Sequence, residues 1–170
     1  VAIVDDVDGD GLADILIGAP ENGVSGGSSG SAYLVLSSSL GGSSVMSLSA
    51  SDYIFMGVSA GDNAGYAVSA AGDLDYDGYQ DIMIGAPGRS SDSGTVYIVN
   101  SLSLGSSSSF LLSNADYELQ GARGVKAGTA LSLAGDVDGD GAQDLLVGAT
   151  GNTVVGDEAG AAYLVRAMDV

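Results

Sequence analysis

The apolar residues of this chain fall in short runs, separated by stretches rich in glycine and serine. Runs of β-branched and apolar residues that end at glycine or proline are typical of buried strands. The clearest examples are "ILIGAP" at 15–20, "IMIGAP" at 82–87 and "LLVGAT" at 145–150. No segment keeps a 3.6-residue apolar period with helix caps at its ends. The pattern therefore predicts an all-β fold.

These runs belong to a longer repeat of about 65 residues, a length that suits propeller blades with long loops. The other recurring segments are "AGYAVSAAGD" (64–73) and "AGTALSLAGD" (127–136); "GSAYLVL" (30–36), "GTVYIVN" (94–100) and "GAAYLVR" (160–166); and "SDYIFMG" (51–57) and "ADYELQG" (115–121). Four short strands per unit correspond to one β-propeller blade. We therefore expect blade 1 at 1–57, blade 2 at 58–121 and blade 3 at 122–170.

The first and last units are shorter than the middle one. The first lacks the start of its innermost strand, and the third has no counterpart of "ADYELQG", its outer strand. Propeller rings commonly take four to eight blades, so the sequence predicts about two and two-thirds blades of a larger propeller or array. The other blades would come from further chain, which we favour, or from other copies, as in a filament.

An acidic nine-residue loop precedes each "GAP-like" strand: loop 1 is "DVDGDGLAD" (6–14), loop 2 is "DLDYDGYQD" (73–81) and loop 3 is "DVDGDGAQD" (136–144). Carboxylates packed this closely repel one another unless a cation lies between them. Glycine at position 6 allows a tight turn, and a carbonyl at position 7 can complete a shell of oxygen ligands. The sequence therefore predicts three calcium sites with aspartates at positions 1, 3, 5 and 9 and the carbonyl at 7: Asp6, Asp8, Asp10, Leu12 and Asp14; Asp73, Asp75, Asp77, Tyr79 and Asp81; Asp136, Asp138, Asp140, Ala142 and Asp144.

Other readings of the loops are weaker. Magnesium prefers six ligands in strict octahedral geometry and keeps its waters, and zinc is disfavoured because the chain has neither Cys nor His. An EF-hand needs a glutamate at position 12, where this chain has Ile17, Ile84 and Val147. A merely solvated acidic turn is a reasonable reading of one loop, but three loops at matched positions argue against it.

The composition of the chain limits its possible fold, partners and cellular setting. The chain has 170 residues, 45% of them apolar, and a mean hydropathy of +0.30, which indicates a folded core. Its net charge of −18 argues against nucleic acid and anionic membranes as partners, and 12 of its 22 acidic residues lie in the three loops. Absence of cysteine leaves the redox compartment open, while calcium sites filled at millimolar ion favour an extracellular or cell-surface setting. No apolar run is long enough to predict direct membrane insertion.

The order of an "AGYA" strand, a DxDxDGxxD loop, a strand ending in Gly-Ala-Pro and a "Y-hydrophobic-V" strand resembles the FG-GAP repeat of integrin α-subunit β-propellers and their bacterial relatives. The resemblance covers nearly the whole chain. It departs from the family at Gly65-Tyr66 and Gly128-Thr129, which replace Phe-Gly, and at Thr150, which replaces the third Pro. The resemblance implies that the twelve loop aspartates bind calcium at the edge of a propeller.

The functional hypothesis is a calcium-binding extracellular propeller module for adhesion, recognition or surface or filament structure. Its partners would be a protein or glycan ligand, or further blades or copies of itself. Without His, Cys or a Ser-His-Asp set, the usual catalytic constellations are missing, so we expect no enzyme within this chain. The alternative is a non-catalytic propeller portion of a larger secreted hydrolase or lyase.

Two further expectations concern the segments outside the loops. The serine-rich connections 37–51 and 100–114 are predicted to be exposed, flexible links between strands, with a glycan-decorated or ligand-facing surface as the alternative. Tyr33, Tyr97 and Tyr163 recur at equivalent strand positions, where packing is favoured over sugar stacking.

Overall fold

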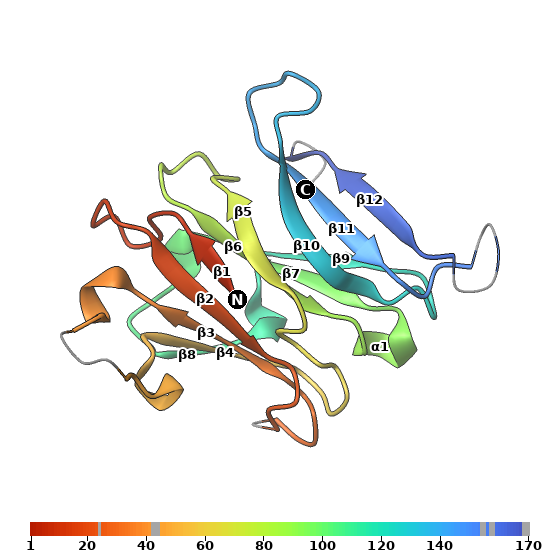
Figure 1. Cartoon of the computed structure of the whole chain (residues 1–170), viewed down its shortest axis with the longest axis horizontal. Helices are drawn as coiled ribbons and strands as arrows, with labels where there is room; N and C mark the ends of the chain where they lie inside the picture. Colours follow the sequence, from red (N-terminus) through yellow and green to blue (C-terminus); the bar gives the residue numbers. More distant parts are fainter. Residues whose placement is uncertain (24, 42–44, 154–155, 157–158, 168–170) are drawn as a thin grey trace.

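The computed structural model describes residues 1–23, 25–41, 45–153, 156 and 159–167, and its strands form three sheets (Figure 1). The first sheet has the order β1-β2-β3-β4-β8, the second β5-β6-β7-β9 and the third β10-β11-β12. The prediction of an all-β fold is therefore confirmed. The strands are β1 (Ala2–Val4), β2 (Asp14–Ala19), β3 (Ser31–Val35), β4 (Tyr53–Met56), β5 (Val68–Gly72), β6 (Asp81–Ala86), β7 (Thr95–Val99), β8 (Ser109–Leu111), β9 (Tyr117–Gln120), β10 (Ala127–Gly135), β11 (Asp144–Ala149) and β12 (Ala161–Val165).

Helical structure in the described residues is short and lies between strands. Four 3₁₀ turns, η1 (Ser37–Ser39), η2 (Leu48–Ala50), η3 (Ser101–Ser103) and η4 (Leu112–Asn114), accompany one short helix, α1 (Arg89–Asp92). None of the helices in this described part is long and apolar enough to cross a membrane.

The repeat in sequence is matched by a repeat in strand register. Ile17 pairs with Tyr33 across β2 and β3, Ile84 with Tyr97 across β6 and β7, and Val147 with Tyr163 across β11 and β12. The connection between β6 and β7 is shorter than those between β2 and β3 and between β11 and β12, yet the three hairpins keep the same register. Equivalent residues therefore take equivalent places in all three sheets.

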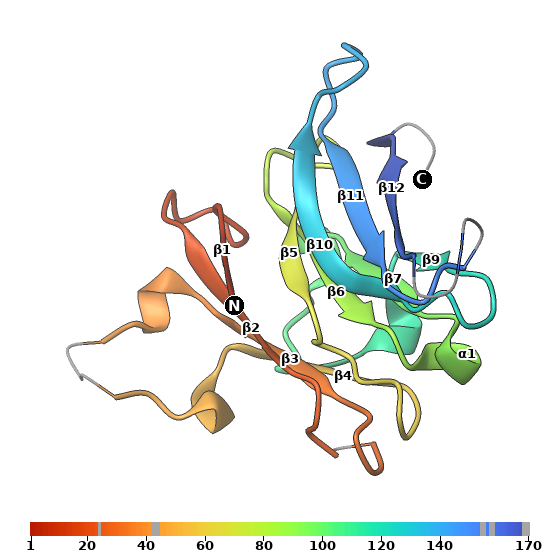
Figure 2. The same ribbon diagram turned by 45° about the vertical axis from the view of Figure 1, so that its right-hand side comes forward.

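The second sheet lies between the other two (Figure 2). Ile82 and Ile84 of β6 pack in a cluster with the first sheet, while Met83 packs with Leu145 and Val147 of the third. Successive side chains of a strand point to opposite faces, so a strand covered on both faces reads as a continuous apolar run. This is why β6 and β7 are buried at every residue.

The glycines of the first two "GAP" motifs permit the backbones of neighbouring sheets to touch. A Cβ added to Gly18 would lie 1.9 Å from the carbonyl oxygen of Gly65, and one added to Gly85 would lie 2.2 Å from that of Gly128. No side chain fits at such distances, so larger residues would push the neighbouring sheet away. The motif glycines therefore set the spacing between adjacent sheets.

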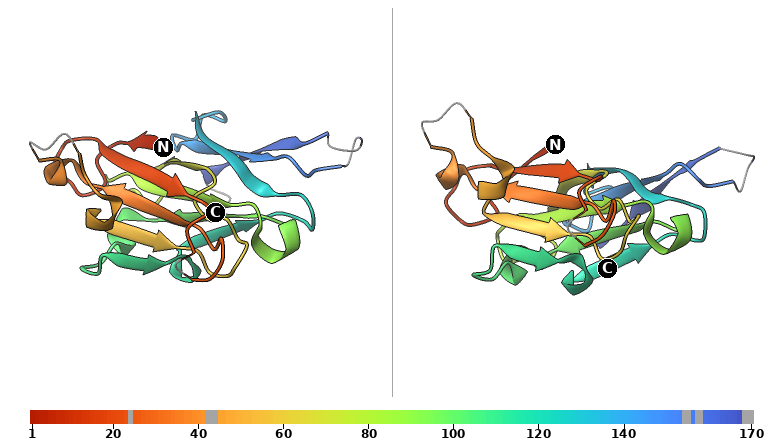
Figure 3. Two further views of the ribbon diagram at one scale, coloured as in Figure 1. Left: turned by 60° about the horizontal axis from the view of Figure 1, so that its bottom comes forward. Right: turned by 90° about the horizontal axis from the view of Figure 1, so that it is seen from below.

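The connection 100–114 corrects one prediction. Most of its residues are exposed, as predicted, but the segment contains an ordered strand, because β8 pairs in parallel with β4 (Figure 3). This pairing places Phe110 opposite Phe55, with ring centroids 5.7 Å apart. Leu112 is fully buried. The serine-rich average of this segment obscured three consecutive apolar residues, Phe110 to Leu112. In connection 37–51, residues 42–44 lie outside the described part, and the flanking Leu40 and Val45 are exposed.

The three tyrosines at equivalent strand positions differ in burial. Tyr33 and Tyr97 are buried, as a packing role requires, whereas Tyr163 is 41% exposed. The packing role is thus confirmed for the first two sheets, and the third has an open face at the same position.

Candidate metal centres

Each acidic loop brings three carboxylates together. In loop 1 they belong to Asp6, Asp8 and Asp10, in loop 2 to Asp73, Asp75 and Asp77, and in loop 3 to Asp136, Asp138 and Asp144. Within each trio, one carboxylate oxygen per residue lies within 4.8 Å of the others. Oxygen atoms at this separation can share a hard divalent cation, since Ca²⁺ binds oxygens at roughly 2.3–2.6 Å.

The loop backbone holds these carboxylates in place. In loop 2, Asp73 accepts hydrogen bonds from the amides of Asp77 and Gly78, both at 2.9 Å, and Asp77 accepts one from the amide of Tyr79 at 2.7 Å. The equivalent bonds from Gly141 to Asp136 (3.0 Å) and from Ala142 to Asp140 (2.8 Å) occur in loop 3. Loop 1 has the same bonds from Gly11 to Asp6 (2.9 Å) and from Leu12 to Asp10 (2.8 Å). These short-range bonds turn the first and fifth side chains toward the loop interior.

The ninth residue of each loop is a fully buried aspartate at the start of β2, β6 or β11: Asp14, Asp81 and Asp144. Asp81 accepts one amide on each oxygen, from Leu74 at 2.8 Å and from Ser101 at 2.9 Å. The corresponding donors are Val7 and Ser37 for Asp14, and Val137 and Ala167 for Asp144. Each oxygen keeps a further lone pair, so this residue can fix the loop and still face a cation.

Burial of these carboxylates without a bound cation is unfavourable. The pKa of Asp81 is raised to about 6: burial is the largest cause, the amides of Leu74 and Ser101 oppose the rise, and the charges of Asp75 and Asp77 add to it. Burial also raises the pKa of Asp14. A carboxyl group whose ionised form is destabilised in this way, beside other carboxylates, gains from a divalent cation.

Comparison with known proteins agrees with this architecture. The sequence matches the family described as "FG-GAP repeat" over residues 1–35, 64–99 and 127–165, which together make up more than half of the chain. This chain belongs to the FG-GAP repeat family. FG-GAP repeats are β-propeller blades, and we therefore call strands β1 to β4 blade 1, strands β5, β6, β7 and β9 blade 2, and strands β10 to β12 blade 3.

Similar curated proteins include integrin α subunits. The chain is 33% identical to integrin alpha-4 of Xenopus laevis over 150 residues, 85% of this chain and 13% of that protein. It is 29% identical to integrin alpha-PS5 of Drosophila melanogaster over 169 residues, 99% of this chain and 16% of that protein. It is 35% identical to integrin alpha-8 of Gallus gallus over 178 residues, which cover 98% of this chain and 15% of that protein. The chain thus spans less than a fifth of these relatives and is an integrin-α-like portion of an FG-GAP propeller.

Two serines that the sequence analysis did not select also contact acidic loops 1 and 2. The hydroxyl of Ser37 donates to Asp10 at 2.7 Å, and that of Ser101 donates to Asp77 at 2.8 Å. Both serines follow a "Y-hydrophobic-V" strand and begin a 3₁₀ turn. Their equivalent position after β3 and β7 is a signal that could have identified them.

Loop 3 differs from the other two loops. The residue equivalent to Ser37 and Ser101 is Ala167, which offers no hydroxyl to Asp140. Asp140, at position 5, is missing from the carboxylate trio of loop 3, and Asp144, at position 9, belongs to the trio instead. Arg166 Nη1 also lies 3.7 Å from Asp138 Oδ2, so a cation at this loop shares Asp138 with a guanidinium group. The three loops are therefore related but not identical.

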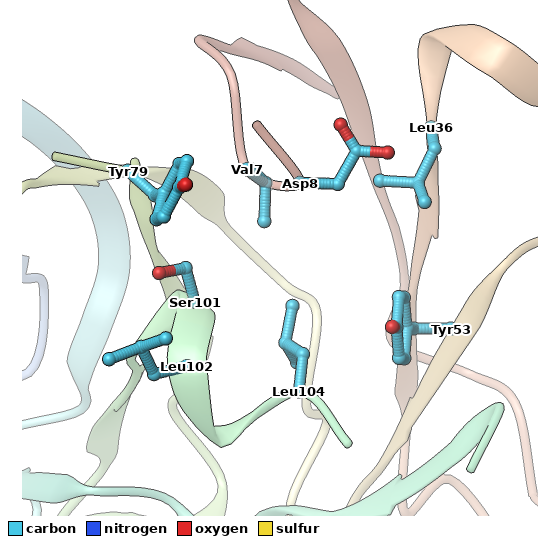
Figure 4. Close-up of a pocket in the computed structure, with 8 residues that line it drawn as sticks. All are labelled: Val7, Asp8, Leu36, Tyr53, Tyr79, Ser101, Leu102 and Leu104. Atoms are coloured by element: carbon cyan, nitrogen blue, oxygen red, sulfur yellow. The ribbon is translucent and has the colours of Figure 1, made fainter. Parts of the chain in front are cut away.

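Loops 1 and 2 touch each other between blades. The amide of Gln80 donates to the carbonyl oxygen of Asp6 at 2.9 Å, and the ring of Tyr79 lies against Gly9, where an added Cβ would be 2.7 Å away. Beside this contact is a cavity of about 290 Å³ between Tyr79 and Tyr53, with Asp8 at its rim (Figure 4). The two loops are thus packed as one surface at this end of the blades.

Replacing the sixth residue of a loop tests this geometry. Gly78 and Gly141 have φ of 92° and 95°, in the left-handed region that favours glycine, and an added Cβ at either position meets no atom within 4 Å. Gly141→Val is therefore expected to cost about 1–2 kcal/mol or more through backbone strain alone, and to weaken calcium binding by loop 3. Urea denaturation and calcium titration of the variant provide the measurements.

Gly105→Val is the matched control, because Gly105 has no positive φ and its added Cβ also meets open space. Its stability and calcium affinity should stay close to those of the original chain. Equal losses in both variants, or unchanged calcium affinity in Gly141→Val, would contradict the shared loop geometry.

Proposed function

We propose that this chain is a calcium-binding portion of an extracellular or cell-surface FG-GAP propeller that serves adhesion or recognition. Three calcium ions would occupy the acidic loops, with the carboxylates and the carbonyls of Leu12, Tyr79 and Ala142 as ligands. The observation that carries the proposal is the convergence of three carboxylates around one point in each loop. The fully buried ninth aspartate lies beside the trio in loops 1 and 2 and belongs to it in loop 3.

Calcium suits these loops better than magnesium. Asp6, Asp8 and Asp10 come from a nine-residue turn in which single residues separate the carboxylates. Ca²⁺ accepts six to eight oxygens in flexible geometry, whereas Mg²⁺ requires near-ideal octahedral contacts at about 2.0–2.1 Å. A charge-rich, all-oxygen loop of this kind therefore favours the larger ion.

The role in adhesion or recognition is supported by the family and by similarity to integrin α subunits. Partners would be a protein or glycan ligand, or further blades and copies. In this role the ions hold the loops rigid at one end of the blades, because each loop connects two strands of the same sheet: β1 and β2, β5 and β6, or β10 and β11. Filled loops would thus keep the adjoining surface in one conformation.

Counting bound calcium tests the assignment. Equilibrium dialysis of the metal-free chain against calcium should give about three ions per chain. The third residue of each loop belongs to its carboxylate trio, so Asp8→Asn, Asp75→Asn and Asp138→Asn should each weaken one site and lower the count toward two at limiting calcium.

Asp92→Asn serves as the control because Asp92 is exposed and lies outside the loops, where it pairs with Lys126 at 4.0 Å. Its count should remain three. A count near zero in the original chain, or an equal effect of the control and the loop variants, would reject the proposed sites.

A further inference from the structure

In blades 1 and 2, the residue that follows the third strand lies beside the third aspartate of the acidic loop. In blade 2 this residue is Asn100, and its Nδ2 donates a hydrogen bond of 3.0 Å to Asp75 Oδ2. In blade 1 it is Leu36, which lines the cavity of about 290 Å³ together with Asp8 (Figure 4). The two blades therefore place side chains of different chemistry near equivalent carboxylates.

The backbone around this position is held in the same way in both blades. The amide of Asn100 donates to Asp116 at 2.8 Å, and the amide of Leu36 donates to Asp52 at 2.8 Å. The carbonyl oxygen of each residue accepts an amide from the 3₁₀ turn that follows, η3 or η1, at 3.0 Å. The difference between the two blades at this position therefore lies in the side chain.

The two third aspartates differ in the hydrogen bonds that orient them. On its Oδ1, each accepts the amide two residues later, at 3.2 Å for Asp8 and 3.3 Å for Asp75. Asp75 has a second bond, on Oδ2, from Asn100. Within the described part of the chain no hydrogen bond reaches Oδ2 of Asp8, and Leu36 has no polar side-chain atom to supply one. Asp75 is thus held on both oxygens, and Asp8 on one.

The other polar atom of the Asn100 side chain has no partner. Asn100 is 8% exposed, and its Oδ1 is buried without a hydrogen bond to any described residue. This oxygen is an acceptor, as are the ionised carboxylates of loop 2, so the loop side chains cannot satisfy it. Buried acceptors without a donor are uncommon and point to a bound water or ion. Asn100 therefore orients Asp75 and keeps an oxygen available for a hydrated cation.

We propose that Asn100 is a further residue of the loop 2 cation site and makes loop 2 a tighter calcium site than loop 1. The inference rests on the proposed function, because it concerns the same ions. Asn100 positions Asp75 and offers its Oδ1 to water bound by the cation, whereas Leu36 can do neither for Asp8. Loss of a partner that orients a metal-binding side chain typically costs roughly 10–100-fold in metal affinity. We therefore expect the two loops to differ at least about tenfold in calcium affinity.

A calcium titration that follows each loop separately tests the proposal. The amides of Gly11 and Gly78 donate to the first aspartate of their own loops, so their resonances in nitrogen–proton correlation spectra report loops 1 and 2 individually. The 170-residue chain is titrated in calcium-buffered solutions. The Gly78 resonance should reach half of its change at a calcium concentration at least about tenfold below the midpoint for Gly11.

Exchanging the two side chains should exchange the affinities. Asn100→Leu should raise the Gly78 midpoint about tenfold and leave the Gly11 midpoint unchanged. Leu36→Asn should lower the Gly11 midpoint about tenfold and leave that of Gly78 unchanged. Leu40→Asn is the control, because Leu40 is 50% exposed, follows η1 and does not line the cavity beside loop 1. This variant should move neither midpoint.

The possible outcomes separate this inference from the proposed function. Equal midpoints for Gly11 and Gly78, or a lower midpoint for Gly11, would show that the inference is wrong although both loops bind calcium. The same conclusion follows if Asn100→Leu and Leu36→Asn shift the midpoints no more than Leu40→Asn does. If neither glycine resonance responds to calcium, the inference and the proposed calcium sites of both loops are rejected together.

Discussion

Acidification is expected to stabilise the metal-free chain and to destabilise the calcium-loaded chain. Asp81 is fully buried, and its pKa rises from 3.8 to about 6 in the folded state. The folded state therefore binds this proton more tightly than the unfolded state does. The resulting stability is fully present below pH 3.8 and is lost as the pH rises through about 6, a change of about 3 kcal/mol.

Other buried carboxyls act in the same direction without metal. Burial raises the pKa of Asp14 and of Asp62, although Asp62 is also close to Arg89, which lowers it. Bound calcium reverses the dependence, because protons compete with the ion for the loop carboxylates and acidification releases it. As the pH falls, the free energy of unfolding should thus rise for the metal-free chain and fall for the calcium-loaded chain.

Urea denaturation at pH 7, 6 and 5 measures this effect, once in metal-stripped buffer and once in saturating calcium. Asp81→Asn should weaken the pH dependence of the metal-free chain, because it removes one of the buried carboxyl groups whose pKa is raised. If the free energy of unfolding of the metal-free chain instead falls steadily from pH 7 to pH 5, the claim that burial raises the pKa of Asp81 is contradicted.

Local features of the site could be predicted from the sequence. The loops are built from hydrogen bonds between residues two to seven positions apart, such as Gly78 to Asp73 and Leu74 to Asp81. A nine-residue pattern therefore contains most of the information needed to form the turn. The strand after each loop was equally visible, because burial on both faces of β6 requires a continuous apolar run.

Contacts between distant segments could not be predicted in this way. The pairing of β8 with β4 joins Phe110 to Phe55, and the contact of Ser101 with Asp77 crosses a whole hairpin. Neither leaves a periodic signal in its own segment. The difference between the trios of loops 2 and 3 was also hidden, since it depends on whether the residue after the third strand is Ser101 or Ala167.

Removal of calcium is expected to produce the largest loss of stability. A ligand that binds only the folded state stabilises it by RT ln(1 + [L]/Kd), about 2.7 kcal/mol per site at a hundredfold excess. Three filled loops would contribute about 8 kcal/mol, which is comparable with the whole stability of a typical domain, about 5–15 kcal/mol. Without the ion, the trio of Asp73, Asp75 and Asp77 repels itself beside the buried Asp81.

The most direct test of this account is a thermal melt of the chain at neutral pH in three conditions: saturating calcium, chelator, and chelator with excess magnesium. Our account predicts that the chelator lowers the melting temperature by on the order of 15–30 °C, and that magnesium restores only a small part of the loss. A variant with Asp8→Asn, Asp75→Asn and Asp138→Asn should melt at a temperature that no longer responds to calcium. Coincidence of all three curves for the original chain would show that the acidic loops are not structural calcium sites.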